Sequence, residues 1–168
     1  SIILEKNINN FNPNIVICVG QAGGRDKITV ERVAINIDDA RIADNKNNSP
    51  IDEPIRKDGE TAYFSTLPIK ALVAELTKNN IPAAISNTAG TFVCNHIMYE
   101  ILYLSKTKFN NISAGFIHIP YIREQVKNKP NTPFMELEMI IDALKIIIET
   151  SAEFYQRNDI KITGGYKH

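Results

Sequence analysis

The stretch IPAAISNTAGTFVCNHIMYE, residues 81–100, is the starting point for the fold, because a strand, a loop and a helix are predicted in direct succession within it. The apolar run at 81–86 is typical of a short buried strand, and the small residues that follow indicate a loop. A helix is predicted from about residue 92 to 106. Cys94, one of only two cysteines, stands at the start of this helix.

The segments on either side of this stretch continue the alternation of strands and helices. Further strands are predicted at 15–20, 27–37 and 113–122, and helices at 1–10, 68–80 and 134–156. The run at 15–20 is apolar throughout, so we expect it to be buried on both faces. The polar stretch at 38–60 is typical of a lid or substrate loop. This alternation predicts an α/β fold, a three-layer α/β/α sandwich with a mostly parallel, twisted sheet, formed by residues 1–168 as a single domain.

Composition excludes several classes of function. The chain carries 19 basic and 19 acidic residues, without a basic stripe, so we expect no nucleic-acid partner. Its apolar runs are too short to span a membrane, and no segment resembles a secretory signal. Two distant cysteines form no disulfide framework, and metal-binding spacings are absent, so we expect no metal and a reducing, cytoplasmic setting. The chain begins without Met, which suggests a fragment or a processed form.

Cys94 is the first candidate for chemistry. If Thr91 is the N-cap, Cys94 is the third residue of the helix, where free N–H groups and the helix dipole stabilise a thiolate. Such a thiolate is a nucleophile. The alternative is a small buried core residue, and position alone leaves both interpretations open. Cys18 lies within the strand at 15–20 and is predicted to pack.

His118 is the natural partner for this cysteine, because it lies near the carboxyl end of the strand at 113–122. Active sites of open α/β sheets form beyond such strand ends. A single histidine in a strand also fits a core residue. His96 follows Cys94 by two positions and therefore lies on another face of the helix. His168 is close to the last residue of the chain.

Glu31 is the most informative carboxylate. By strand alternation it shares a face with Val33 and Ile35, which is predicted to be the core face. A buried carboxylate needs a hydrogen-bonding partner, and orienting the imidazole of His118 would supply one. The alternative is that Glu31 belongs to the turn before the strand.

The glycine-rich stretch GQAGGR, residues 20–25, follows the first predicted strand. Three glycines favour a tight turn or a close approach to a ligand. Backbone N–H groups there could also hold an anion, although the stretch matches neither the dinucleotide fingerprint nor the P-loop. A small-molecule binding or phosphorylase-like protein is therefore an alternative reading.

Three longer motifs resemble one family. GQAGGRDKITVERVAINIDDARIADN, SNTAGTFVCNHIMYE and GFIHIPYI are similar, in sequence and in order, to segments of the pyroglutamyl peptidases, the cysteine-dependent pyrrolidone-carboxylate peptidases. The spacing of Glu31, Cys94 and His118 also matches that of the family's catalytic residues. The resemblance implies a phosphorylase/hydrolase-like α/β/α sandwich and an omega-peptidase that removes N-terminal pyroglutamyl residues from peptides through a thioester.

The resemblance also assigns roles to individual residues. Cys94 is the implied nucleophile, His118 the proton carrier and Glu31 the residue that orients the imidazole. The implied substrate-binding residues are Gln21, Arg41, Phe92 and Val93, and the N–H of Cys94 with Arg41 would stabilise the oxyanion. No metal or cofactor is implied. The expected partners are N-terminally pyroglutamylated peptides and further copies of the chain, as a homotetramer or a dimer.

The sequence departs from the family pattern in three places. Val30 and Ala43 stand where proline is expected. The family's opening strand, loop, helix and second strand are missing, and that loop is expected to supply aromatic walls of the substrate pocket. A truncated or inactive family member is therefore a further alternative.

Overall fold

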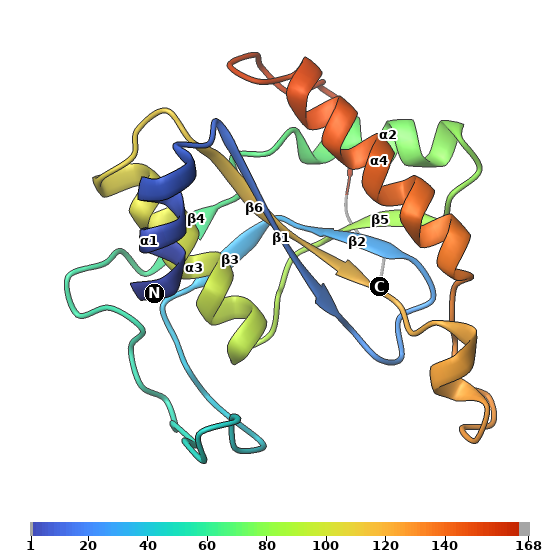
Figure 1. The fold of residues 1–168 in the computed structure, drawn as a ribbon, viewed down its shortest axis with the longest axis horizontal. Coiled ribbons are helices and arrows are strands. Elements are labelled where there is room, and N and C mark those ends of the chain that lie inside the picture. The colour runs from blue at the N-terminus through green and yellow to red at the C-terminus, as the bar shows by residue number, and fades with distance from the viewer. Residues whose placement is uncertain (1, 165–168) are drawn as a thin grey trace.

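A four-stranded mixed sheet is the central element of the computed structural model, which describes residues 2–164 and therefore not His168 (Figure 1). The strands follow the order β1-β6-β2-β5 across the sheet. Strand β1 runs parallel to β6 and β2 runs parallel to β5, whereas β2 and β6 are antiparallel. Most pairings are thus parallel, as predicted. The strands span Ile15–Gln21 (β1), Ile28–Glu31 (β2), Ala83–Ser86 (β5) and Ser113–Ile119 (β6).

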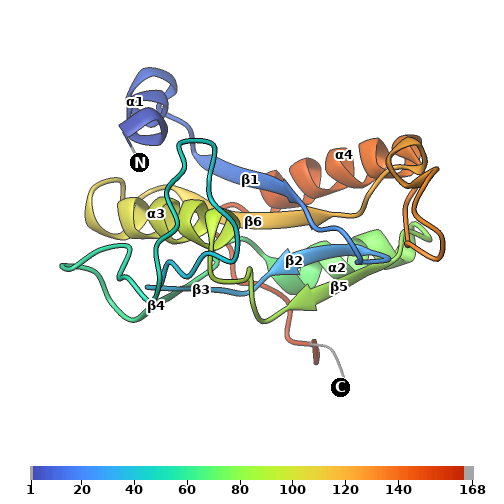
Figure 2. The same cartoon turned by 90° about the horizontal axis from the view of Figure 1, so that it is seen from below.

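Helices cover the two faces of this sheet. Helices α1 and α3 lie together on the left in Figures 1 and 2, and α2 and α4 lie together on the right. Each face of the sheet has its own hydrophobic core. Phe116 of β6 packs with Met98 of α3 in one core, and the next residue, Ile117, packs with Leu72 of α2 in the other. The α/β fold is therefore confirmed. The helices span Ile2–Phe11 (α1), Ile69–Lys78 (α2), Val93–Thr107 (α3) and Leu137–Glu153 (α4), with a 3-10 helix (η1) at Arg123–Val126.

The prediction of one continuous strand over 27–37 is wrong. It divides at Arg32 into β2 and β3 (Val33–Ile35), and β3 pairs with β4 (Ala62–Phe64) in a separate two-stranded sheet. The backbone of Arg32 links the sheets, because its N–H donates to Ser86 at 2.8 Å and its carbonyl accepts from Ser65 at 2.9 Å. Strand alternation consequently does not carry over from Glu31 to Val33.

Two local expectations also need correction. Strand β1 is half-buried rather than buried on both faces, because it lies at an edge of the sheet and pairs only with β6 among the described residues. Helix α3 begins at Val93 with Phe92 as its N-cap, so Thr91 is not the cap. Cys94 is therefore the second residue of the helix and remains in the first turn. Within residues 2–164, no helix is long and apolar enough to cross a membrane.

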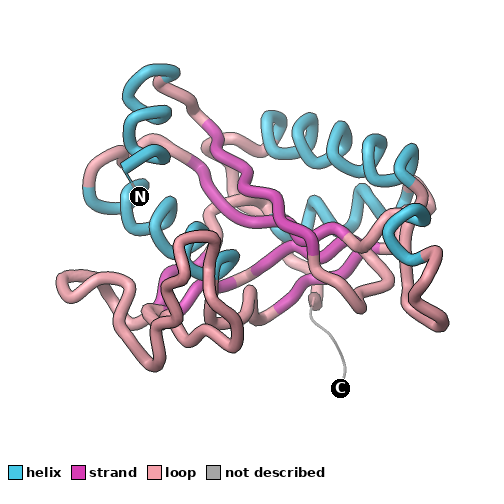
Figure 3. Tube along the Cα trace, turned by 60° about the horizontal axis from the view of Figure 1, so that its bottom comes forward, coloured by secondary structure: helices cyan, strands magenta, loops and turns pink. Residues whose placement is uncertain are grey.

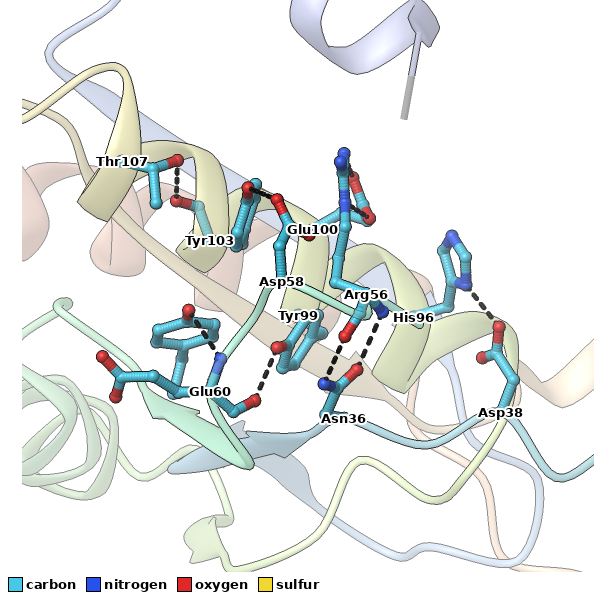
Figure 4. Close-up of polar contacts among 11 residues, drawn as sticks. Asn36, Asp38, Arg56, Asp58, Glu60, His96, Tyr99, Glu100, Tyr103 and Thr107 are labelled. Atoms are coloured by element: carbon cyan, nitrogen blue, oxygen red, sulfur yellow. Dashed lines mark hydrogen bonds and ion pairs between the residues drawn. The ribbon is translucent and has the colours of Figure 1, made fainter. Parts of the chain in front are cut away.

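The long segment between β3 and β4, which Figure 3 shows as loop, is tied to α3 by side chains. The guanidinium of Arg56 donates to both carboxylate oxygens of Glu100, at 2.7 and 2.9 Å. Tyr103 donates to Asp58 at 2.6 Å, next to the same guanidinium (Figure 4). Tyr99 donates to the carbonyl of Glu60 at 2.6 Å (Figure 4). One face of α3 thus holds the end of the loop.

The Arg56→Met variant should show how strongly this contact stabilises the fold. It leaves the buried carboxylate of Glu100 without its charged donor, so we expect the free energy of unfolding to fall by about 2 kcal/mol. Urea denaturation measures the loss. The exposed pair Lys145–Asp142 is the control, because Lys145→Met should cost less than about 0.5 kcal/mol. Equal losses in the two variants would contradict the prediction.

Candidate active site

His118 is the penultimate residue of β6, near the carboxyl end of that inner strand, as predicted. In the register of β6 it faces Gly20 of β1 on one side and Thr29 of β2 on the other. Its side chain points to the α3 face, as that of Phe116 does, and the two ring centroids are 4.8 Å apart. Only 4% of the histidine is exposed, so polar groups of the protein must satisfy its ring nitrogens.

Glu31 supplies one of these polar groups. It is the last residue of β2 and is fully buried, and its Oε1 lies 2.7 Å from Nδ1 of His118. The antiparallel pairing of β2 with β6 brings the two side chains together, because Thr29 opposite His118 shares its face of the strand with Glu31. A carboxylate can only accept, so Nδ1 donates this hydrogen bond.

Cys94 completes the arrangement from the first turn of α3. Its thiol is a neighbour of the imidazole of His118 and raises the pKa of that ring. Because Nδ1 is bonded to Glu31, the nitrogen that faces the thiol is Nε2. The chain passes close beneath the sulfur, since a Cβ built at Gly20 would lie 3.1 Å from Sγ. The imidazole thus lies between the carboxylate, to which it is hydrogen-bonded, and the thiol, which acts on its pKa.

The surroundings of His118 act on its pKa in opposite directions. Burial lowers the pKa, whereas the hydrogen bonds to Cys94 and Glu31 and the negative charges of these partners raise it. The partners prevail, and the pKa of His118 lies above its ordinary value. The imidazolium is thus favoured where a thiolate would need a counter-ion.

A cavity of about 630 Å³ opens beside the sulfur, and Cys94 is part of its wall. All four residues that the resemblance assigned to substrate binding line it. They are Gln21, Arg41, Phe92 and Val93. Asp39, Ile42 and the small residues Ala89 and Gly90 complete much of the lining. The structure therefore places the seven predicted site residues around one centre.

Two hydrogen-bonded contacts join the long loop to this cavity. The N–H of Asp39 donates to the carbonyl of Thr91 at 2.6 Å, and the hydroxyl of Thr91 donates back at 2.9 Å. The amide of Asn95 donates to the carbonyls of Ile35 and Ile37 and accepts from the N–H of Ile35. The residue after Cys94 thereby connects α3 with β3, and the exposed Arg41 lies in the cavity lining two residues beyond Asp39.

Arg25 is a site residue that the sequence reasoning missed. Its Nη1 lies 2.6 Å from Oε1 of Glu31 and also donates to the hydroxyl of Thr29, while its Nη2 donates to the carbonyl of Thr88 at 3.3 Å. A signal was available, because a buried carboxylate commonly needs more than one donor and Arg25 ends the glycine-rich turn.

Gln125 is a second such residue. Its amide and that of Gln21 exchange hydrogen bonds of 2.6 and 3.0 Å, so η1 orients a side chain of the cavity wall. The two residues are far apart in the sequence and no local pattern connects them. Only the three-dimensional arrangement could reveal this pair.

The remaining candidates lie outside the centre. Nδ1 of His96 lies 2.7 Å from Oδ2 of Asp38, as shown in Figure 4, so this histidine does not pair with Cys94. Cys18 is half-buried against the α3-side core, and burial raises its pKa to about 11, as expected of a packing residue. No group of three or more histidine, cysteine or acidic residues within 2–164 could hold a metal ion.

The arrangement suits nucleophilic chemistry at a carbonyl group. A base within reach of the thiol and a carboxylate that orients the base are the usual elements of a triad. The N–H groups of a helix's first turn have no acceptor within the helix, so they can bind an oxyanion beside the sulfur.

Comparison with known proteins agrees with this chemistry. The model of the pyroglutamyl peptidase family matches residues 1–154. A pyrrolidone-carboxylate peptidase of Brachyspira hyodysenteriae is 63% identical over 148 residues, which cover 88% of this chain and 74% of the relative. A protein of the same name from Clostridium perfringens is 59% identical over 162 residues, which cover 96% and 75%.

A solved structure shows the same fold. The crystal structure of pyroglutamyl peptidase I from Bacillus amyloliquefaciens superposes with a TM-score of 0.93 at 48% identity, covering 96% of this chain and 76% of that one. Sequence, fold and family model agree over most of the chain, and the chain belongs to the pyroglutamyl peptidase family.

Proposed function

We propose that this chain removes N-terminal pyroglutamyl residues from peptides, with Cys94 as nucleophile, His118 as proton carrier and Glu31 as the residue that orients the imidazole. The observation that carries the proposal is the succession of these three side chains, in which His118 is hydrogen-bonded to Glu31 and neighbours Cys94, and Cys94 lines the cavity of about 630 Å³. Family membership supports the same reaction.

The first half of the reaction forms a thioester. His118 takes the thiol proton, and the sulfur of Cys94 bonds to the acyl carbon of the pyroglutamyl residue. The C–N bond to the next residue then breaks, and the imidazolium returns the proton to the leaving amine. The raised pKa of His118 favours the imidazolium that this step consumes.

The second half regenerates the enzyme. Neutral His118 takes a proton from water, whose oxygen attacks the thioester, and pyroglutamate and the free thiol result. Glu31 retains its hydrogen bond to Nδ1 throughout, so Nε2 keeps facing the reacting atoms. The backbone N–H of Cys94, with the guanidinium of Arg41 at the rim, would stabilise the oxyanion of both tetrahedral intermediates.

The cavity supplies both apolar and polar groups for a pyrrolidone ring. Phe92 and Val93 offer apolar contacts, and Gln21 offers an amide that can bond to the lactam. The bonds from Gln125 restrict that amide before substrate arrives. Such a pocket selects a small cyclic amide over an extended side chain.

Domain organisation, cellular compartment and oligomeric state are part of the same proposal. We propose one catalytic domain over residues 1–168, since both cores share one sheet. Two free cysteines fit a reducing cytoplasm. Exposed apolar residues on α4, among them Ile141 (43% exposed) and Ile148 (60% exposed), support a homo-oligomer, as a tetramer or a dimer.

Cys94→Ser tests the nucleophile. We expect kcat/KM for a pyroglutamyl-linked fluorogenic amide to fall by roughly three orders of magnitude, because a serine hydroxyl is a far weaker nucleophile beside this imidazole. Cys18→Ala is the control and should retain activity. Full activity of Cys94→Ser would refute the mechanism, whereas an inactive wild-type chain whose Cys94 alkylates normally would indicate an inactive family member.

Glu31→Gln tests the assignment of the carboxylate. Without its charge, burial dominates at His118, so we expect the pKa of this histidine to fall below the ordinary value of about 6.5. NMR titration of the imidazole measures the change. In the wild type the pKa of His118 is higher in the folded than in the unfolded state. His118 therefore stabilises the fold fully below about pH 6.5, and this contribution is lost as the pH rises through the folded-state pKa. That loss should disappear in Glu31→Gln, and an unchanged titration would contradict the assignment.

Gly20→Ala tests how closely β1 approaches the nucleophile. An added Cβ would lie 2.7 Å from the ring of Phe116 and 3.1 Å from Sγ of Cys94, so the ring and the sulfur must move. We expect kcat to fall at least tenfold with a smaller change in KM. Gly24→Ala is the control for steric effects, because a Cβ there meets no atom within 4 Å. Its φ of +93° adds backbone strain only. Unchanged kcat in Gly20→Ala would show that the thiol tolerates displacement.

A further inference from the structure

Glu31 shares a single oxygen between two cationic partners. Its Oε1 lies 2.6 Å from a guanidinium nitrogen of Arg25 and 2.7 Å from Nδ1 of His118. Its Oε2 is buried and accepts no hydrogen bond from the described residues. Arg25 and His118 therefore hold the carboxylate at the same atom, from two directions.

Arg25 has anchors of its own that fix this geometry. It donates to the hydroxyl of Thr29 and to the carbonyl of Thr88. Thr29 is also the cross-strand neighbour of His118 in the β2–β6 pairing. Arg25 is consequently held by β2 and by the loop that leads to α3.

We propose that Arg25 is a positioning residue that keeps the charge of Glu31 compensated, so that His118 can pass between its charged and neutral forms during catalysis. The proposal rests on the proposed triad, because it assigns Arg25 a role through Glu31. Arg25 does not line the cavity beside the thiol, and its hydrogen bonds run to Thr29, Glu31 and Thr88.

The physical reason lies in the cost of a buried charge. His118 is an imidazolium before the leaving amine departs and a neutral base when water attacks. Facing a buried carboxylate with no other cation, the imidazolium would be over-stabilised, and the neutral form would leave the carboxylate uncompensated. The guanidinium of Arg25 is always charged and removes most of this difference.

The titratable and charged groups around His118 come from few elements. Glu31 comes from β2 and Cys94 from α3, and Arg25 acts through Glu31 from the preceding turn. From β1 the neighbour in register is Gly20, which has no titratable group. A change in the pH dependence of the site on removal of Arg25 therefore has few possible sources.

Arg25→Met is the principal variant. We expect the deprotonation of the imidazolium to move to higher pH by about one unit, and kcat near neutral pH to fall about tenfold because the second half of the reaction needs neutral His118. The thioester should accumulate and be visible by intact-mass measurement. The rate of alkylation of Cys94 by iodoacetamide, followed by peptide mass spectrometry, measures the same shift without substrate.

Arg56→Met is the matched control, because the side chains of Arg25 and Arg56 are equally exposed, at 29%, and each pairs with a buried glutamate. Loss of stability alone should affect both variants. Only Arg25→Met should move the pH profiles of kcat and alkylation. Arg25→Lys retains the charge and should lie closer to the wild type than Arg25→Met does.

Chemical rescue provides a separate readout. A cavity of about 310 Å³ borders Arg25 and is also lined by Gly24, Thr29, Ser86 and Thr88. Truncation in Arg25→Ala would extend this cavity to the carboxylate of Glu31. Guanidinium chloride, far below denaturing concentration, should then restore part of kcat and return the pH profile, whereas sodium chloride at equal ionic strength should not. Arg56→Ala should not respond.

The outcomes separate this proposal from the proposed function. An Arg25→Met profile that coincides with that of the wild type, together with a loss of stability like that of Arg56→Met, would overturn the role of Arg25 and leave the triad intact. An alkylation profile that moves in a chain without peptidase activity would support the role of Arg25 and count against the proposed reaction.

Discussion

The antiparallel pairing of β2 with β6 is the constraint on which the site depends. It sets Thr29 opposite His118, and the next residue on the same face of β2 is Glu31. A parallel pairing at this position would reverse β2 and carry its carboxylate away from the imidazole. The same reversal lets the chain leave the sheet at Arg32 and form the second, smaller sheet below α3. Strand direction, more than strand composition, therefore creates the site.

Much of the fold was predictable because the relevant signals are local. Apolar runs and helical spacing identified the helices and strands around Phe116, Leu72 and Met98, and these residues form the two cores. The prediction missed the break at Arg32, although the apolar alternation changes phase there, from Ile28 and Val30 before it to Val33 and Ile35 after it. The hydrogen bonds of Arg32 to Ser65 and Ser86, which are distant in sequence, carry no local signal.

The candidate site shows the same division. Cys94 at a helix start and His118 in a strand carried local signals, strand alternation indicated Glu31, and the spacing typical of a known family supported all three. The correct burial of Glu31 was reached through an incorrect step, because the strand alternation that linked it to Val33 does not exist. Gln125 could not be assigned a role, since η1 brings it to its partner Gln21. Arg25 was missed although it ends the glycine-rich turn ahead of a carboxylate that was expected to be buried. Long-range pairing of polar groups leaves no periodic trace in a sequence.

The long loop between β3 and β4 has an energetic consequence for catalysis. Although it contains no helix and no regular strand, side chains of α3 hold one part of it, and Thr91 holds the part that carries Arg41. Ordering a backbone residue costs about 1–2 kcal/mol in conformational entropy. Here that entropy is lost when the chain folds, so the binding of a peptide does not have to supply it. A small substrate with few contacts can therefore meet a rim that is already in place.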